Sequence, residues 1–239
     1  MKKNILFALS SIICLLNIVS CNNTLLPIRI PTGEPTIPQN NIIKEIPRYE
    51  ENNNVYLFYK LAKQKEKQLN LDIPENGYDS LLLRLWFVYP ENLHQYAEMV
   101  EIKYPSDGNI KATYTKMRIF FNPTRDYEQI NYHVDSIISM PKNGWNSFTE
   151  ILNRLNIIDL PTIEQIPLYK ESVTGRGYDN NYLTVACEIA TEKKYRFIQY
   201  NNFEKHKNIN EVSRMYEFIR FIRTEFNMQK IDEAWYGES

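Results

Sequence analysis

The chain has 239 residues, of which 43% are hydrophobic and 24% are charged, and its formal net charge at neutral pH is −1. A chain of this length and composition can bury the core of one large domain or of two small ones. The near balance of acidic and basic residues gives no electrostatic reason to expect a nucleic-acid partner, which would require a strongly basic patch.

The N-terminal segment, residues 1–20, has the layout of a secretion signal. Lys2 and Lys3 precede a short apolar run over residues 5–19, which small polar residues and Asn17 interrupt. The run is shorter than the roughly 18 or more apolar residues that a membrane-spanning helix requires. We therefore expect a cleaved signal peptide. The residues that follow suggest one particular kind of signal peptide. A plain secretion signal and a membrane-spanning anchor are the alternatives to it.

The segment closes on Ile18-Val19-Ser20-Cys21. These four residues resemble the lipobox of bacterial lipoproteins. The resemblance implies cleavage before Cys21 and attachment of a diacylglycerol to its thiol, so that the lipid holds the protein on a membrane. No acidic cluster stands near Cys21. On this basis we expect a location in the cell envelope, on the periplasmic face of the outer membrane.

Residues 21–47 contain five of the twelve prolines in the chain. That proline density excludes a helix, and the other residues are mostly polar or isolated Ile and Leu. We expect this lipidated N-terminus and tether to hold a single domain, residues 48–239, away from the bilayer. The alternative is an arm that packs along the domain through apolar residues such as Ile42 and Ile43.

Periodicity in the domain predicts both helices and strands. Apolar residues recur at helical spacing near residues 55–69, 145–156 and 210–226. The first of these stretches carries a charged run over residues 60–68, which we expect to form its solvated face. Strands are expected near residues 80–88, 97–104, 110–121, 182–190 and 194–200. Residues 122–143 are irregular, with a possible short strand near 132–138.

Tight turns join consecutive strands, and Asp107-Gly108 is typical of a hairpin because glycine tolerates the positive φ of the turn. The element order therefore predicts an α+β fold with a mainly antiparallel sheet of about five strands packed with about three helices. The half that begins at Trp145 is similar in general layout to uncharacterised lipoproteins of Gram-negative bacteria. That similarity implies no activity.

Three strand residues raise questions of pairing. Arg84 interrupts a strand that is apolar on both faces, so its guanidinium needs a partner or a route to water. Glu188 and Arg196 lie on opposite strands near a turn and could pair across them. An exposed pair of this kind would contribute only about 0–1 kcal/mol.

Cys187 is the one cysteine outside the signal and the lipobox, so the mature chain has no partner for an intramolecular disulfide. The alternating pattern points its side chain inward with Val185 and Ile189. A buried thiol is usually an inert packing group, which is the role we expect here. A catalytic cysteine is the alternative.

The sequence lacks a nucleophile elbow, a phosphate loop, a dinucleotide fingerprint and a paired-histidine zinc helix. His94, His133 and His206 are far apart in the chain. We expect neither a metal nor a cofactor.

A loop over residues 170–181 contains Gly175 and Gly177, and aromatic residues surround it. Aromatic side chains on such a loop can bind sugars, peptides or a protein partner. The candidate binding residues are Tyr169, Arg176, Tyr178 and Tyr182.

These features predict a lipid-anchored binding or accessory protein. Its partners would be the membrane, through the lipid on Cys21, and an envelope protein or a glycan. An inhibitor or immunity protein is one version of this role. The competing hypothesis is an envelope hydrolase with a site built from scattered Asp, Glu, His or Tyr. A cleft with converging carboxylates or histidines would favour the hydrolase, whereas a flat aromatic patch would favour binding.

Overall fold

The computed structural model describes residues 42–48, 53–89, 96–122, 127–138, 140–162, 165–167 and 183–228. In these residues seven strands form one sheet, in the spatial order β1-β7-β6-β2-β3-β4-β5. The strands are β1 (Ile43–Glu45), β2 (Leu81–Val88), β3 (Tyr96–Tyr104), β4 (Lys111–Asn122), β5 (Tyr127–Ile138), β6 (Thr184–Thr191) and β7 (Lys194–Asn201). The α-helices are α1 (Asn53–Gln68), α2 (Gly144–Arg154) and α4 (Asn210–Glu225).

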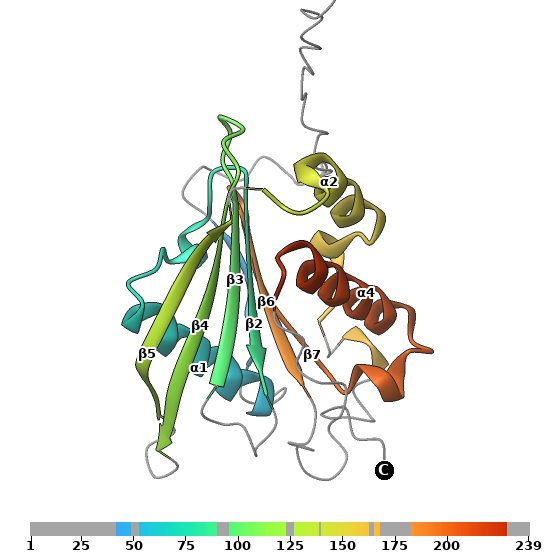
Figure 1. The fold of residues 1–239 in the computed structure, drawn as a ribbon. Coiled ribbons are helices and arrows are strands. Elements are labelled where there is room, and N and C mark those ends of the chain that lie inside the picture. Colours follow the sequence, from blue (N-terminus) through green and yellow to red (C-terminus); the bar gives the residue numbers. More distant parts are fainter. Residues whose placement is uncertain are drawn as a thin grey trace, which may run out of the picture.

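The sheet separates two layers of helix (Figure 1). Helix α1 crosses one face, and α2 and α4 cover part of the other. Every strand pair is antiparallel except β1–β7, which is parallel. The prediction of an α+β fold with a mainly antiparallel sheet is therefore confirmed. The three predicted helices and the β3–β4 hairpin are also present, and Gly108 in that hairpin has φ +76°.

The sheet has two more strands than the five predicted, and β5 is the longer of them. It spans 12 residues, whereas the sequence indicated only a possible short strand near 132–138. Residues 133–137 are exposed on both faces of the sheet, so no apolar alternation marks them. A bulge also shifts the register with β4 between Arg118 and Ile119. Strand formation here depends on pairing with β4 rather than on a sequence pattern.

The other additional strand is β1, which the sequence analysis placed in the tether. Its three residues pair with β7, and the Ile43 N–H donates to the Lys193 carbonyl at 2.9 Å. Ile42 packs beside Gly77, whose φ is +81° and where an added Cβ would lie 2.7 Å from the Ile42 Cδ1. Residues 42–45 therefore pack along the sheet, as the arm alternative describes. The signal peptide, Cys21 and the rest of the tether lie outside the described residues.

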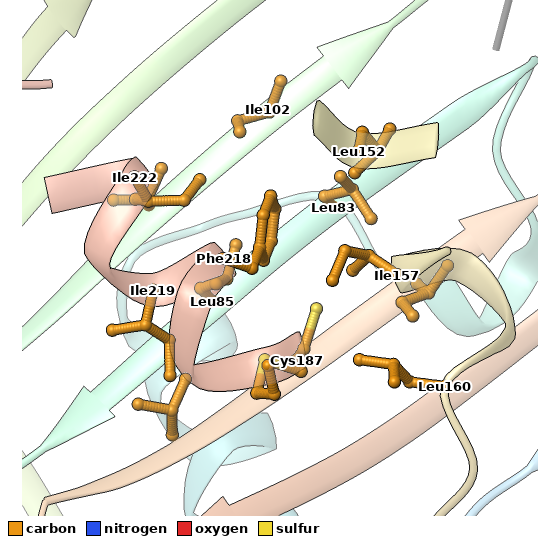
Figure 2. Packing of buried hydrophobic residues seen from close by; sticks show 14 of the residues in the cluster. Leu83, Leu85, Ile102, Leu152, Ile157, Leu160, Cys187, Phe218, Ile219 and Ile222 are labelled. Carbon is orange, nitrogen blue, oxygen red and sulfur yellow. The ribbon is translucent and has the colours of Figure 1, made fainter. Parts of the chain in front are cut away.

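The larger core lies between the sheet and the layer of α2 and α4. Figure 2 shows part of it, where strands β2, β3 and β6 meet α4, α2 and the segment after α2. Its buried members include Leu83, Leu85, Ile102, Leu152, Ile157, Leu160, Cys187, Phe218, Ile219 and Ile222. Cys187 is a free, buried thiol in this cluster, as predicted, and burial raises its pKa. It is a packing residue.

The layer beneath α1 has a smaller apolar cluster. Its buried members are Ala62, Leu82, Trp86, Ala97, Met99, Met117, Ile119, Ala186, Ala190, Tyr195 and Phe197. Buried charged side chains also lie in this layer, among them Glu66, Arg84, Glu101 and Glu188.

Candidate functional site

Five charged side chains meet between α1 and the centre of the sheet, and we call them the Arg84 cluster. They are Lys63, Glu66, Arg84, Glu101 and Glu188. The side chains of Arg84 and Glu188 have no exposed surface, and those of Glu66 and Glu101 are 5% and 7% exposed. Charged groups are rarely buried so deeply unless they are paired, because water solvates them far better than protein does.

The sheet register places three of these residues side by side on adjacent strands. Arg84 lies on β2, directly opposite Glu101 on β3 and Glu188 on β6. Residues directly opposite in neighbouring strands point to the same face of the sheet. Arg84 is therefore flanked by a carboxylate on each side. These carboxylates are the partners that its buried guanidinium needs.

Arg84 uses all three of its nitrogen atoms. Its Nε donates to Glu101 Oε2 at 2.9 Å, and Nη2 donates to the same oxygen and to the Asp72 carbonyl. Its Nη1 donates to Glu66 from α1 and to Glu188 at 3.3 Å. Charge-assisted hydrogen bonds of this kind are roughly twice as strong as neutral ones. The guanidinium thereby joins two strands, a helix and the segment that follows that helix.

Glu188 is the acceptor at the centre of the cluster. Its Oε1 accepts from Lys63 Nζ and from the Tyr195 hydroxyl at 2.7 Å. Its Oε2 accepts from Arg84 and from Trp86 Nε1 at 2.8 Å. Four donors match the roughly four lone-pair sites of an ionised carboxylate, so Glu188 is fully hydrogen-bonded without water.

Helix α1 supplies Lys63 and Glu66 from the face that also carries Tyr59 and Ala62. Positions i, i+3, i+4 and i+7 share one side of a helix, so these four residues lie together. Lys65 and Glu66 are 2% and 4% exposed. The prediction that residues 60–68 form a solvated face was therefore wrong for its central residues. Glu66 contacts Arg84 of the sheet, and Lys63 contacts Glu188.

Further ion pairs and hydrogen bonds connect the Arg84 cluster to partly exposed side chains. Lys63 lies 3.3 Å from Glu75, to which the Tyr59 hydroxyl donates at 2.6 Å. Lys103 bonds to Glu101 at 2.9 Å and to Asp72 at 2.7 Å. The network thus reaches half-exposed groups on one side of the layer.

Burial and neighbouring charges shift the pKa values of Glu66 and Glu188 in opposite directions. Burial, together with the charge of Glu188, raises the pKa of Glu66 to about 8. Burial alone would also raise the pKa of Glu188, but Lys63 and Arg84 outweigh it and lower that pKa. The pKa of Lys63 is raised, because the attraction of Glu188 and Glu66 exceeds the cost of burial. The opposite shifts mean that Glu66 gives up its proton at a higher pH than Glu188 does.

A proton on Glu66 reduces the negative charge of the cluster. Its three carboxyls face Arg84 and Lys63, and Lys103 beside the cluster also pairs with Glu101. A protonated acid beside an ionised base is also the pairing that acid–base catalysis uses. Here, however, α1 closes the site, and no substrate atom can reach the fully buried Glu188 while the helix stays in place. In this geometry the cluster holds α1 on the sheet.

Glu188 and Arg196 do not pair as the sequence suggested. Glu188 lies opposite Phe197 in the β6–β7 register, and Arg196 lies opposite Ile189. The two charged side chains consequently point to opposite faces. Arg196 donates to Glu45 on β1 and to the carbonyls of Ile158 and Leu160, so it fastens the edge of the sheet to the segment after α2.

A second polar group lies on the opposite face, between the sheet and α4. The hydroxyls of Tyr89 and Tyr114 donate to the two oxygens of Glu98. Arg223 of α4 donates to the Tyr89 hydroxyl at 2.7 Å and lies 3.5 Å from Glu98. Glu98 is 8% exposed, so this group also joins a helix to strands rather than presenting a carboxylate to solvent.

The candidate residues from the sequence fall mostly outside the described part of the chain. This applies to Cys21, to His94 and to the loop residues Tyr169, Arg176, Tyr178 and Tyr182. His133 lies on β5, and His206 ends the 3₁₀ helix Phe203–His206. Within the described ranges no three His, Cys, Asp or Glu residues are grouped so that they could hold a metal ion. No helix in the same ranges is long and apolar enough to cross a membrane.

The chain matches no protein-family model, no curated protein and no solved structure. Its function must therefore be argued from its own residues.

The sequence contained partial signals for the Arg84 cluster. Arg84 in an apolar strand demanded partners, and the spacing of Tyr59, Ala62, Lys63 and Glu66 placed two charges on the apolar side of α1. The partners Glu101 and Glu188 could not be chosen from the sequence, because the pairing of β2 with β6 joins segments about a hundred residues apart.

Proposed function

We propose that the chain is a lipid-anchored binding or accessory protein of the cell envelope. The observation that carries the proposal is the sequence Ile18-Val19-Ser20-Cys21 directly after a short apolar run. In this proposal residues 1–20 are removed, Cys21 carries the lipid, and the domain acts on the periplasmic face of the outer membrane. Its partner is an envelope protein or a glycan, with the loop residues Tyr169, Arg176, Tyr178 and Tyr182 as candidate contacts.

Two features of the domain support binding over hydrolysis. The converging carboxyls Glu66, Glu101 and Glu188 are buried between α1 and the sheet and accept hydrogen bonds from donors of the protein itself. In contrast, the edge strand β5 presents five consecutive exposed residues, 133–137. Partner proteins can bind such edges by adding a strand.

The anchor is tested by replacing Cys21 with Ser in the native host, followed by membrane fractionation and intact-mass measurement. The wild-type chain should partition into detergent and begin at Cys21 with the mass of the lipid. The C21S variant should lack that mass and leave the membrane fraction, because two or more buried acyl chains are what hold a lipoprotein stably. A wild-type chain that is soluble, unlipidated and cut elsewhere would refute the proposal.

The alternative is an envelope hydrolase, and one observation favours it. Glu66 and Glu188 differ in protonation in the way that a general acid and a base differ. Catalysis would require α1 to leave the sheet so that a substrate could enter. Hydrolysis of an envelope polymer by the purified chain, lost in Glu66→Gln without a fall in the melting temperature, would establish this alternative.

A further inference from the structure

The strand β5 forms one end of the sheet. Among the described strands β4 alone pairs with it. Residues 133–137 are all exposed, and Ile137, at 87%, is the most exposed large apolar residue in the described part of the chain. A strand edge of this kind offers N–H and C=O groups for pairing with another strand.

The N-terminal part of this edge is closed by the protein itself. The side chain of Gln68, the last residue of α1, accepts a hydrogen bond from the Ile130 backbone N–H at 2.8 Å. A strand that approached this position would have to displace Gln68. The accessible stretch therefore begins after Ile130 and extends through the exposed residues 133–137.

We propose that this stretch of β5 pairs with the same stretch of a second copy of the chain, antiparallel and about a two-fold axis at Val134. The sequence His133-Val134-Asp135 is complementary to itself in this register. Val134 of each copy faces Val134 of the other, and each His133 faces the Asp135 of the other copy.

The charge pattern selects this register over its neighbours. A two-fold axis at Asp135 would place two carboxylates directly opposite each other, and opposed like charges destabilise a strand pair. An axis at His133 would leave Asp135 without an opposing imidazole. In the Val134 register an imidazole N–H can donate to a carboxylate on each side of the axis, in either protonation state of the histidine.

The Asp135 carboxylate can accept a hydrogen bond from His133 of the second copy. Asp135 accepts from the Thr115 hydroxyl at 2.6 Å through Oδ1, and its Oδ2 lies 4.0 Å from His133 Nε2 of the same chain. The two side chains are 50% and 45% exposed. Each carboxylate oxygen can accept about two hydrogen bonds, so a second donor can be accommodated. The paired stretch, residues 132–136, also ends before the Gln68 contact at Ile130.

The register does not depend on the lipid anchor, but the proposed anchor would favour the pairing. Copies held on one membrane surface meet at a higher effective concentration than copies in solution. A short edge-to-edge contact, which is weak between soluble molecules, is then sufficient for a dimer.

Disulfide cross-linking of the full-length chain tests the register directly. The only other cysteine of the domain is Cys187, which is buried and does not compete. In Val134→Cys, the two thiols lie directly opposite each other, within about 4.5–5.5 Å between Cβ atoms. Copper–phenanthroline oxidation of membranes should therefore give a covalent dimer. Ile137→Cys is the matched control. It is more exposed, but the register separates its two copies by roughly 20 Å along the strands.

The charge argument has its own test in the Val134→Cys background. His133→Asp should slow cross-linking roughly fivefold to tenfold, because both opposed pairs become like-charged. Adding Asp135→His should restore the rate. Cross-linking of Val134→Cys no faster than that of Ile137→Cys, or a rate unaffected by His133→Asp, would overturn the proposal. Fractionating the same samples shows where the chain resides, so failure of the dimer and failure of the anchor are distinguished.

Discussion

Arg84 and Leu85 are neighbours on β2, yet their side chains enter two layers of very different chemistry. Leu85 packs in the large apolar cluster under α2 and α4, to which Phe218 and Ile222 of α4 also belong. Arg84 enters the opposite layer, where Glu66, Glu101 and Glu188 surround it. Both side chains are fully buried. One strand thus stabilises a helix on each side of the sheet, by apolar packing on one face and by ionic hydrogen bonds on the other.

The difference matters because the two kinds of contact respond differently to change. Apolar packing is non-directional, depends on buried area and is insensitive to pH. A buried ionic network is stabilising only while every charge is matched, since desolvation costs as much as attraction returns. The α1 layer should therefore be the more sensitive to loss of one partner and to pH.

The largest effect is expected for Arg84→Met, which removes the cation and leaves buried carboxyls without their shared donor. Breaking a buried pair in this way costs about 3–5 kcal/mol, and we expect about 4 kcal/mol at pH 8 by urea denaturation. The loss should be smaller at pH 5, where the carboxyls can take up protons. Arg154→Met is the control. That arginine pairs with Glu217, but both side chains are about half exposed, so the change should cost less than about 1 kcal/mol.

A slightly smaller effect is expected for the neighbouring Leu85→Ala. Truncating a buried leucine costs about 2–5 kcal/mol from lost burial and the cavity left behind, and we expect about 3 kcal/mol. Its free-energy loss should be the same at pH 5 and pH 8, because Leu85 is fully buried in a cluster of apolar side chains. A loss for Leu85→Ala that varied with pH as strongly as that of Arg84→Met would show that the layers are not independent.

The sequence predicted the two layers unequally. The apolar layer follows from patterns that can be read locally, such as the stripe Val212, Met215, Ile219 and Ile222 on α4 and the inward Cys187. The α1 layer depends on long-range register, which sets Glu101 and Glu188 beside Arg84. The charged run of α1 looked like a solvated face because such runs usually are. The sequence indicated only a possible short strand near 132–138 within β5 for a related reason, since exposure on both faces removes the alternation that marks a strand.

The pH response of the α1 layer follows from Glu66. The pKa of its carboxyl rises from an ordinary value of 4.5 to about 8 in the folded protein. Below pH 4.5 both folded and unfolded chains hold this proton, and between pH 4.5 and 8 only the folded chain retains it. The contribution of Glu66 to stability is therefore fully present below about pH 4.5 and is lost as pH rises through about 8.

The most direct test is the unfolding free energy of wild type and of Glu66→Gln from pH 4.5 to 9, measured by urea denaturation. Glutamine resembles the protonated carboxyl and cannot ionise, so its side-chain oxygen can accept the hydrogen bond from Arg84 at every pH. Relative to wild type, the variant should gain stability steadily as pH rises, by on the order of 3 kcal/mol at pH 9. Parallel curves for the two proteins over this range would contradict a proton held in the Arg84 cluster.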